Sequence, residues 1–264
     1  MTVDSPGTRT RLPKIGQFLL VVVGYLVIVQ GLTLLLADPD STGGSIESVD
    51  ALLRGVIVPV ALGAAFVVAI VAWVGGWTQI FVSARRLRRW TLVIPVLLLL
   101  GIIAVTNYGG LMQAGLLHAL VLLTAVLLVG FAEELLFRGL GVAAFQSTGR
   151  SEFAVAGWTS LIFGIAHGSN GFITGDFGAA LLQVVLTTLT GAVFYLVLRT
   201  TGSLVVGMAA HGLWDFGILS TQIDLSNTYD IVNFAPVLII VLLLIVLTWR
   251  KRLARAVQDG QRGY

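Results

Sequence analysis

Five ionisable side chains that could do chemistry lie in stretches that are otherwise apolar. Glu133 and Glu134 follow a run from 114 to 131 in which His118 is the only ionisable group. The other sites are His167, at the end of Phe163-Gly-Ile-Ala-His167, and the pair His211 and Asp215. An ionised carboxylate in hydrocarbon is costly, so an acid inside a membrane segment indicates a functional site by default.

These residue types support two kinds of hydrolysis in which water is the nucleophile. A carboxylate and a histidine can hold and deprotonate a water as general base, and a histidine with a protonated aspartic acid can donate to an oxyanion. Alternatively, Glu133, His167 and His211 are the ligand set of a Zn²⁺ hydrolase with one position left for water. The sequence has no His-Glu-x-x-His motif, which excludes the common zinc-protease helix, and no serine has the setting of an activated nucleophile.

Each polar residue also has a purely structural interpretation. Glu134 and Arg138 are four residues apart, so they could form an ion pair within one helix, and Arg138 could extend its charged end to the membrane interface. His211 and Asp215 have the same spacing and could hydrogen-bond in helix packing. We assign His118 to packing.

The composition predicts an all-α membrane protein. Of the 264 residues, 57% are hydrophobic and only 11% are charged, with a mean hydropathy of +0.97. Soluble domains carry about 25% charged residues, so no sizeable soluble domain is expected. The absence of cysteine excludes disulfides and thiolate chemistry. Basic residues cluster at the ends of apolar segments, which favours a membrane surface as partner rather than nucleic acid.

Eight apolar segments are expected to cross the bilayer as a helix bundle. Their approximate bounds are Ile15–Leu36, Leu52–Phe81, Leu92–Val105, a fourth from Leu111 with the two glutamates near its far end, Phe153–His167, Phe177–Leu198, Ser203–Leu219 and Ile231–Trp249. Arginine and lysine occur in the two terminal tails and in every second connecting loop, which predicts that both termini are cytoplasmic.

The chain is expected to divide into four parts: a cytoplasmic tail (1–14), helices one to three (15–110), a catalytic core of helices four to seven (111–220), and helix eight with a basic tail (221–264). In the core, Gly164 and Gly168 form a small-xxx-small pair. We expect this pair to allow close approach of a neighbouring helix and to bring His167 near the glutamates.

Three motifs resemble those of the CPBP family, which comprises CAAX proteases and bacteriocin-processing enzymes and is also called the Abi family. They are Glu133-Glu134-x-x-x-Arg138, Phe163-x-x-x-His167 and His211-x-x-x-Asp215, in the family's order and within about 111–216. The resemblance implies an intramembrane endopeptidase in which Glu133 and His167 activate water, His211 and Asp215 form the oxyanion site, and Glu134 and Arg138 support them. Position 215 is usually Asn in the eukaryotic CAAX branch, and Asp215 would have to be protonated to donate.

Two other functions stay open at the level of sequence. One is a non-catalytic membrane scaffold or bacteriocin-immunity factor of the same fold, and the other is a transporter, which also places acids and histidines in mid-membrane. Short loops without a eukaryotic targeting tail favour the plasma membrane of a prokaryote. The expected partners are the lipid bilayer and a membrane-associated peptide or protein substrate, which in the family includes prenylated tails.

Overall fold

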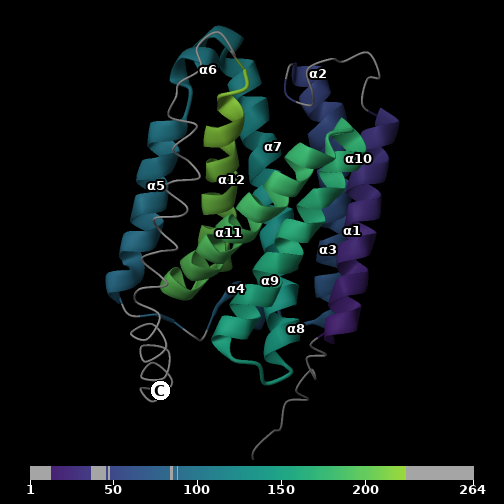
Figure 1. Cartoon of the computed structure of the whole chain (residues 1–264), viewed down its shortest axis with the longest axis vertical. Helices are drawn as coiled ribbons and strands as arrows, with labels where there is room; N and C mark the ends of the chain where they lie inside the picture. Colours follow the sequence, from purple (N-terminus) through teal and green to yellow (C-terminus); the bar gives the residue numbers. More distant parts are fainter. Residues whose placement is uncertain (1–12, 37–45, 47, 84–85, 88, 224–264) are drawn as a thin grey trace, which may run out of the picture.

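We describe a computed structural model, which covers residues 13–36, 46, 48–83, 86–87 and 89–223 (Figure 1). The described residues form helices, with one isolated bridge between Val82 and Ser203. The predicted eighth segment, the basic C-terminal tail and most of the predicted N-terminal tail lie outside the described residues. The all-α fold class is therefore confirmed for the described part of the chain.

The helices follow one another with short connections. In chain order they are α1 (Ile15–Leu36), α2 (Val49–Leu52), the π-helical turn η1 (Leu53–Ile57), α3 (Val58–Val74), α4 (Trp77–Phe81), the 3₁₀ turn η2 (Arg89–Leu92), α5 (Val93–Val105), α6 (Tyr108–Ala114), α7 (Leu116–Glu134), the π-helical segment η3 (Leu135–Gly141), α8 (Val142–Gln146), α9 (Glu152–His167), the 3₁₀ turn η4 (Gly168–Asn170), α10 (Gly171–Thr174), α11 (Phe177–Thr201) and α12 (Leu204–Ser220).

Within the described residues, four helical stretches are long and apolar enough to cross a membrane. They are Ile15–Leu36, Val49–Val74, Leu116–Gln146 and Phe177–Thr201, and a fifth is added if Trp90–Val105 and Tyr108–Ala114, bent by 56°, count as one span. α9 and α12 have 16 and 17 residues, fewer than a membrane crossing of about 20 residues needs. The chain is a multi-pass membrane protein, and the eight spans with cytoplasmic termini stay a prediction.

Two predicted boundaries were wrong, and glycine is the reason for both. The second segment ends at Val74 instead of continuing to 81, because Gly75 and Gly76 have φ of 75° and 86°, which breaks the helix before α4. The long fourth helix begins at Leu116 rather than 111, after Gly115 with φ of 87°. It also continues to Gln146, so the two glutamates lie well inside it and not near its end.

Glycines set the distance between the helices that carry the polar residues. A Cβ at Gly130 of α7 would lie 2.5 Å from Met208 O, and one at Gly212 of α12 would lie 2.8 Å from Val126 O. The two backbones therefore touch one turn before the glutamates. This contact places the glutamates beside the middle of α12.

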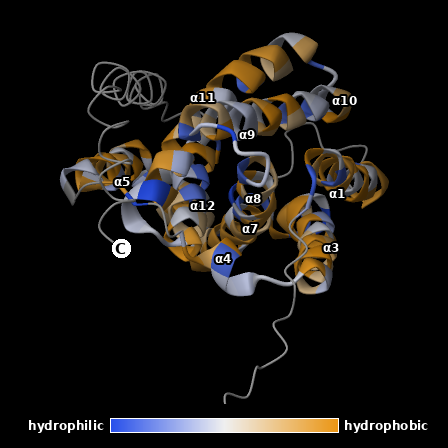
Figure 2. Ribbon diagram, turned by 90° about the horizontal axis from the view of Figure 1, so that it is seen from below, coloured by the Kyte–Doolittle hydropathy of each residue, from blue (hydrophilic) through white to orange (hydrophobic). Residues whose placement is uncertain are grey.

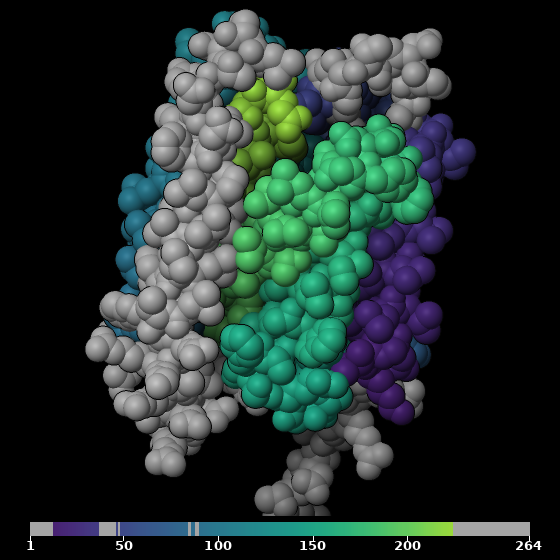
Figure 3. Space-filling view, in the orientation of Figure 1, coloured from purple at the N-terminus to yellow at the C-terminus, as the bar shows by residue number. Residues whose placement is uncertain are grey.

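The predicted close approach at Gly164 is present, but its partner is α11. A Cβ at Gly164 would overlap Thr188 Oγ1 and lie 2.6 Å from Val184 O. Gly164 thus seats α9 against α11, and it brings His167 near α7 only indirectly. α9, α10 and α11 form one face of the molecule, bordered by α1 (Figure 3).

The long helix α7–η3–α8 runs through the centre of the bundle. Viewed along the bundle, α7 and α8 lie inside a ring formed by α1, α3, α4, α9, α11 and α12 (Figure 2). Its buried face includes Leu135, Leu136 and Leu140, which are fully buried in the main apolar core. Every side chain of η3 is buried, so the segment that follows the glutamates has no contact with lipid.

Candidate active site

Three helices bring the two histidines to one carboxylate. Oε2 of Glu133, on α7, lies 3.8 Å from Nε2 of His167 on α9 and 3.8 Å from Nε2 of His211 on α12. These distances exceed a direct hydrogen bond, so a bridging water is the contact to consider. Oε2 of Glu133 is buried and has no hydrogen-bond partner among the described residues.

Glu134 faces the closed side of the same cluster. Its Oε1 lies 2.9 Å from Nη1 of Arg138 and 3.0 Å from Nδ1 of His211, and the side chains of Glu134 and Arg138 are both 0% exposed. Since an ionised carboxylate only accepts, Nδ1 of His211 carries a proton and donates it. Glu134 therefore fixes the orientation of His211 and leaves Nε2 facing Glu133.

Arg138 is held inside the protein and does not extend to the interface, so that prediction was wrong, whereas the predicted ion pair with Glu134 is present. Nη2 of Arg138 donates to the Gly191 carbonyl at 2.8 Å, and the guanidinium lies 4.3 Å from the centre of the Phe163 ring. Both contacts point the side chain towards α9 and α11. A buried charge requires such pairing, and Glu134 supplies it.

The ring of His167 is oriented by its own helix. Nδ1 of His167 lies 2.9 Å from the carbonyl oxygen of Phe163, four residues earlier. A carbonyl only accepts, so Nδ1 carries the proton, and Nε2 of the neutral ring has a free lone pair directed at Glu133. The 3.8 Å gap therefore separates two groups that can each accept a proton from water.

His211 lies beside Asp215 within α12, as the i, i+4 spacing predicts. Nε2 of His211 lies 3.4 Å from Oδ2 of Asp215, and the imidazole stacks on Phe194 with ring centres 4.4 Å apart. An Nε2–H on this ring would point between Asp215 and Glu133. His211 and Asp215 can therefore donate to an oxyanion only when at least one additional proton is bound, on Nε2 of His211 or on the carboxylate of Asp215.

One side of the cluster is more accessible than the other. The side chains of Glu133, His167 and Asp215 are 14%, 18% and 27% exposed, whereas those of Glu134 and Arg138 are fully buried. The Glu133 side is therefore the more accessible side of the cluster, while the Glu134 side is closed. The structure brings all six predicted site residues together, and their catalytic roles stay predictions.

His118 is not part of this cluster. It lies on α7 fifteen residues before Glu133, which is about 22 Å along a helix axis. It is 8% exposed, in agreement with a packing position.

The metal alternative has no geometric support in the described residues, among which no group of three or more His, Cys, Asp or Glu side chains could hold a metal ion. Nδ1 of His211 is bonded to Glu134, and its Nε2 is nearer to Asp215 than to Glu133. The set Glu133, His167 and His211 stays a prediction as zinc ligands.

Several supporting contacts were not foreseen from the sequence. Phe163 belongs to a motif, but nothing in its spacing showed that its ring would cover Arg138. The stacking of Phe194 on His211 and the bond from Arg138 to the Gly191 carbonyl join distant helices, so no local pattern could reveal them. Arg199 lies near the C-terminal end of α11, where a basic residue was expected at the membrane surface, but it is buried.

Residues 115–217 match the family model that is described as type II CAAX prenyl endopeptidase Rce1-like. This segment belongs to the CAAX protease family. The match begins one residue before α7, ends within α12, and contains all six site residues, so it confirms the resemblance drawn from the three motifs. No curated protein and no solved structure matches the chain.

The match supports a general function for this segment. Its family is one of intramembrane endopeptidases of the CAAX type, which are proteases and therefore hydrolases. The apolar helices agree with a protease embedded in the membrane.

Proposed function

We propose that the chain is an intramembrane endopeptidase that hydrolyses peptide bonds of membrane-associated protein or peptide substrates, with lipidated or CAAX-like tails as the first class to test. Glu133 and His167 activate the attacking water, and His211 with Asp215 stabilises the oxyanion. The proposed location is the plasma membrane of a prokaryote. Zinc is not required by this proposal.

The observation that carries the proposal is the unpartnered Oε2 of Glu133 between two histidine nitrogens. Glu133 Oε2 and His167 Nε2 are 3.8 Å apart. A water about 2.8 Å from both atoms would make an angle of about 85° at its oxygen, so a water fits between the two side chains with little movement. A buried carboxylate oxygen without a donor is costly in a structural role. In the proposed function a bound water donates to this oxygen, which removes the cost.

The proposed steps balance in protons. Glu133 accepts a proton from the water while the water oxygen forms a bond to the carbonyl carbon of the substrate. The carbonyl oxygen becomes an oxyanion, which accepts hydrogen bonds from Nε2–H of His211 and from protonated Asp215. The C–N bond then breaks, and the proton held by Glu133 passes to the leaving amine.

Glu134 and Arg138 act as positioning residues in this scheme. Glu134 holds Nδ1 of His211 and thereby keeps Nε2 directed at the oxyanion position. Arg138 balances the charge of Glu134 where both side chains are fully buried. Neither side chain is exposed to a substrate.

The experiment compares one glutamate variant and two histidine variants of the purified protein with wild type. Wild type, Glu133→Gln, His167→Gln and the matched control His118→Gln are incubated in detergent with membrane-tethered and prenylated peptides, and products are detected by mass spectrometry. Cleavage by wild type and His118→Gln, but not by Glu133→Gln or His167→Gln, is expected. Cleavage by Glu133→Gln at the wild-type rate would refute the proposed base.

A further inference from the structure

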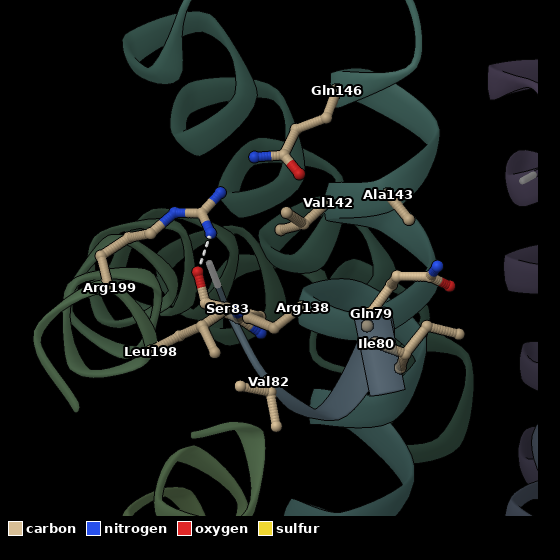
Figure 4. A pocket seen from close by; sticks show the side chains of 11 residues that line it. Gln79, Ile80, Val82, Ser83, Arg138, Val142, Ala143, Gln146, Leu198 and Arg199 are labelled. Carbon is tan, nitrogen blue, oxygen red and sulfur yellow. Dashed lines mark hydrogen bonds between the residues drawn. The ribbon is translucent and has the colours of Figure 1, made fainter. Parts of the chain in front are cut away.

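A cavity of about 210 Å³ has Arg138 of the catalytic cluster in its wall (Figure 4). It is bordered by α4 and the two residues that follow it, by η3 and α8, and by the C-terminal end of α11. The lining residues that matter here are Gln79, Ser83, Arg138, Ala143, Gln146 and Arg199. Arginine is the only ionisable residue type among these.

Arg199 presents an unused donor in this cavity. Its Nε lies 3.0 Å from both Glu152 Oε2 and the Tyr195 hydroxyl, and its Nη1 donates to Ser83 Oγ. Nη2 is buried and has no hydrogen-bond acceptor among the described residues. In Figure 4 the dashed bond to Ser83 leaves the other nitrogen of the guanidinium facing Gln146.

Arg138 has a second unused donor. Nη1 lies 2.9 Å from Oε1 of Glu134 in an ion pair and Nη2 donates to the Gly191 carbonyl, whereas the buried Nε has no acceptor among the described residues. Unpaired buried N–H groups cost free energy, so two of them on arginines that line one cavity indicate that an acceptor belongs there. Gln79, Ser83 and Gln146 add polar groups to the same wall.

The cavity lies at the end of the bundle that the charge pattern predicts to be cytoplasmic. The segment after α4 reads Ser-Ala-Arg-Arg-Leu-Arg-Arg from 83 to 89, and Leu87 N donates to the Arg199 carbonyl at 2.7 Å. Trp77 is 40% exposed and packs on Phe81 at the start of this region. Exposed tryptophan is enriched at the level of lipid headgroups.

We propose that this cavity binds the phosphate of an anionic phospholipid in the cytoplasmic leaflet. Two arginines with free donors, polar amides and a hydroxyl suit a phosphate oxygen, and basic pockets between membrane helices recognise such headgroups. The volume is below that of pockets for drug-sized ligands, which agrees with one small group and not a whole cofactor. The proposal is independent of the peptidase function.

Native mass spectrometry, which counts the lipids that stay bound to the protein, tests the proposed phosphate site. The purified protein is mixed with equal amounts of phosphatidylglycerol and phosphatidylcholine, and the bound lipid is counted for wild type, Arg199→Gln, Ala143→Leu and Arg150→Gln. Ala143→Leu fills the cavity without changing an arginine. Arg150→Gln removes one charge from the loop between α8 and α9, and Arg150 does not line the cavity.

Wild type and Arg150→Gln are expected to prefer phosphatidylglycerol, and Arg199→Gln is expected to lower that preference about fivefold, the effect of one basic residue near a lipid surface. Ala143→Leu should lower it at least as much, and it decides the question alone if Arg199→Gln does not fold. Inorganic phosphate added as competitor separates a free phosphate from a headgroup: displacement of the lipid supports the shared phosphate chemistry, and retention supports the lipid. Equal binding of both lipids by wild type, or unchanged preference in both cavity variants, would overturn the proposal.

Discussion

The two adjacent glutamates should respond to the same substitution in opposite ways. In Glu134→Gln the guanidinium of Arg138, which is 0% exposed, stays buried but loses its ion pair at 2.9 Å. Removing one partner of a buried ion pair costs about 3–5 kcal/mol. In Glu133→Gln no hydrogen bond to Oε2 is lost, since that atom has no partner among the described residues.

These differences translate into melting temperatures. A loss of about 1 kcal/mol shifts Tm by about 2–4 °C in a protein of this size class, so Glu134→Gln is expected to lower Tm by about 10 °C. Glu133→Gln is expected to change it by less than about 2 °C while abolishing peptidase activity. Tryptophan fluorescence during heating in detergent measures the first quantity, and peptide cleavage measures the second.

A double variant tests whether the buried charge is the cause. Arg138→Met combined with Glu134→Gln removes both charges and should be more stable than Glu134→Gln alone, since an uncompensated charge no longer remains. Equal melting temperatures for the two single glutamate variants would refute the division into a closed side and an open side. A double variant less stable than Glu134→Gln would refute the charge explanation.

Three further predictions concern the residues around this cluster. Asp215→Asn should keep peptidase activity within a few-fold, because an amide donates without an added proton, whereas Asp215→Ala should lower kcat about a hundredfold. Gly164→Leu should lower both Tm and activity, because its side chain would enter α11, while Gly157→Leu on the same helix meets open space and should change neither. Gln30→Leu should lower kcat more than Tm, because Gln30 of α1 donates to the turn that follows His167.

Each of these has a clear contrary outcome. Equal loss of activity in the Asn and Ala variants of Asp215 would show that the carboxylate itself is needed. Unchanged activity in Gly164→Leu would show that α9 can shift without moving His167. A Gln30→Leu enzyme with wild-type kcat, measured with the peptide used for wild type, would make the contact with α1 purely structural.

The sequence predicted the members of the cluster because apolar surroundings made them conspicuous. Glu133, His167 and His211 interrupt long apolar stretches, and the i, i+4 spacing of His211 and Asp215 predicted their contact. The contact between His211 and Glu134 could not be predicted, because it depends on which face of α7 meets α12. That face is set by Gly130 and Gly212, whose role is visible only when the two backbones are seen together.

Helix limits were less predictable than helix identity for a related reason. Hydropathy does not distinguish a continuous apolar helix from two helices joined at glycine, so the breaks at Gly75–Gly76 and Gly115 were missed. Beyond Glu134 the chain continues as a buried π-helical segment, although the sequence alone indicated an approach to the interface. Arg138 was therefore expected near water and is buried instead.

The adjacency of Glu133 and Glu134 is what allows one helix to build both sides of the site. Consecutive residues on a helix point about 100° apart, so one carboxylate can face the accessible gap to His167 while the next enters the closed space behind His211. His211 lies between them, with Nδ1 bonded to Glu134 and Nε2 directed at Glu133. A single imidazole thus connects the buried ion pair that orients it with the carboxylate proposed to activate water. If the two acids were not consecutive in the sequence, one helix could not present them to the two sides of His211 in this way.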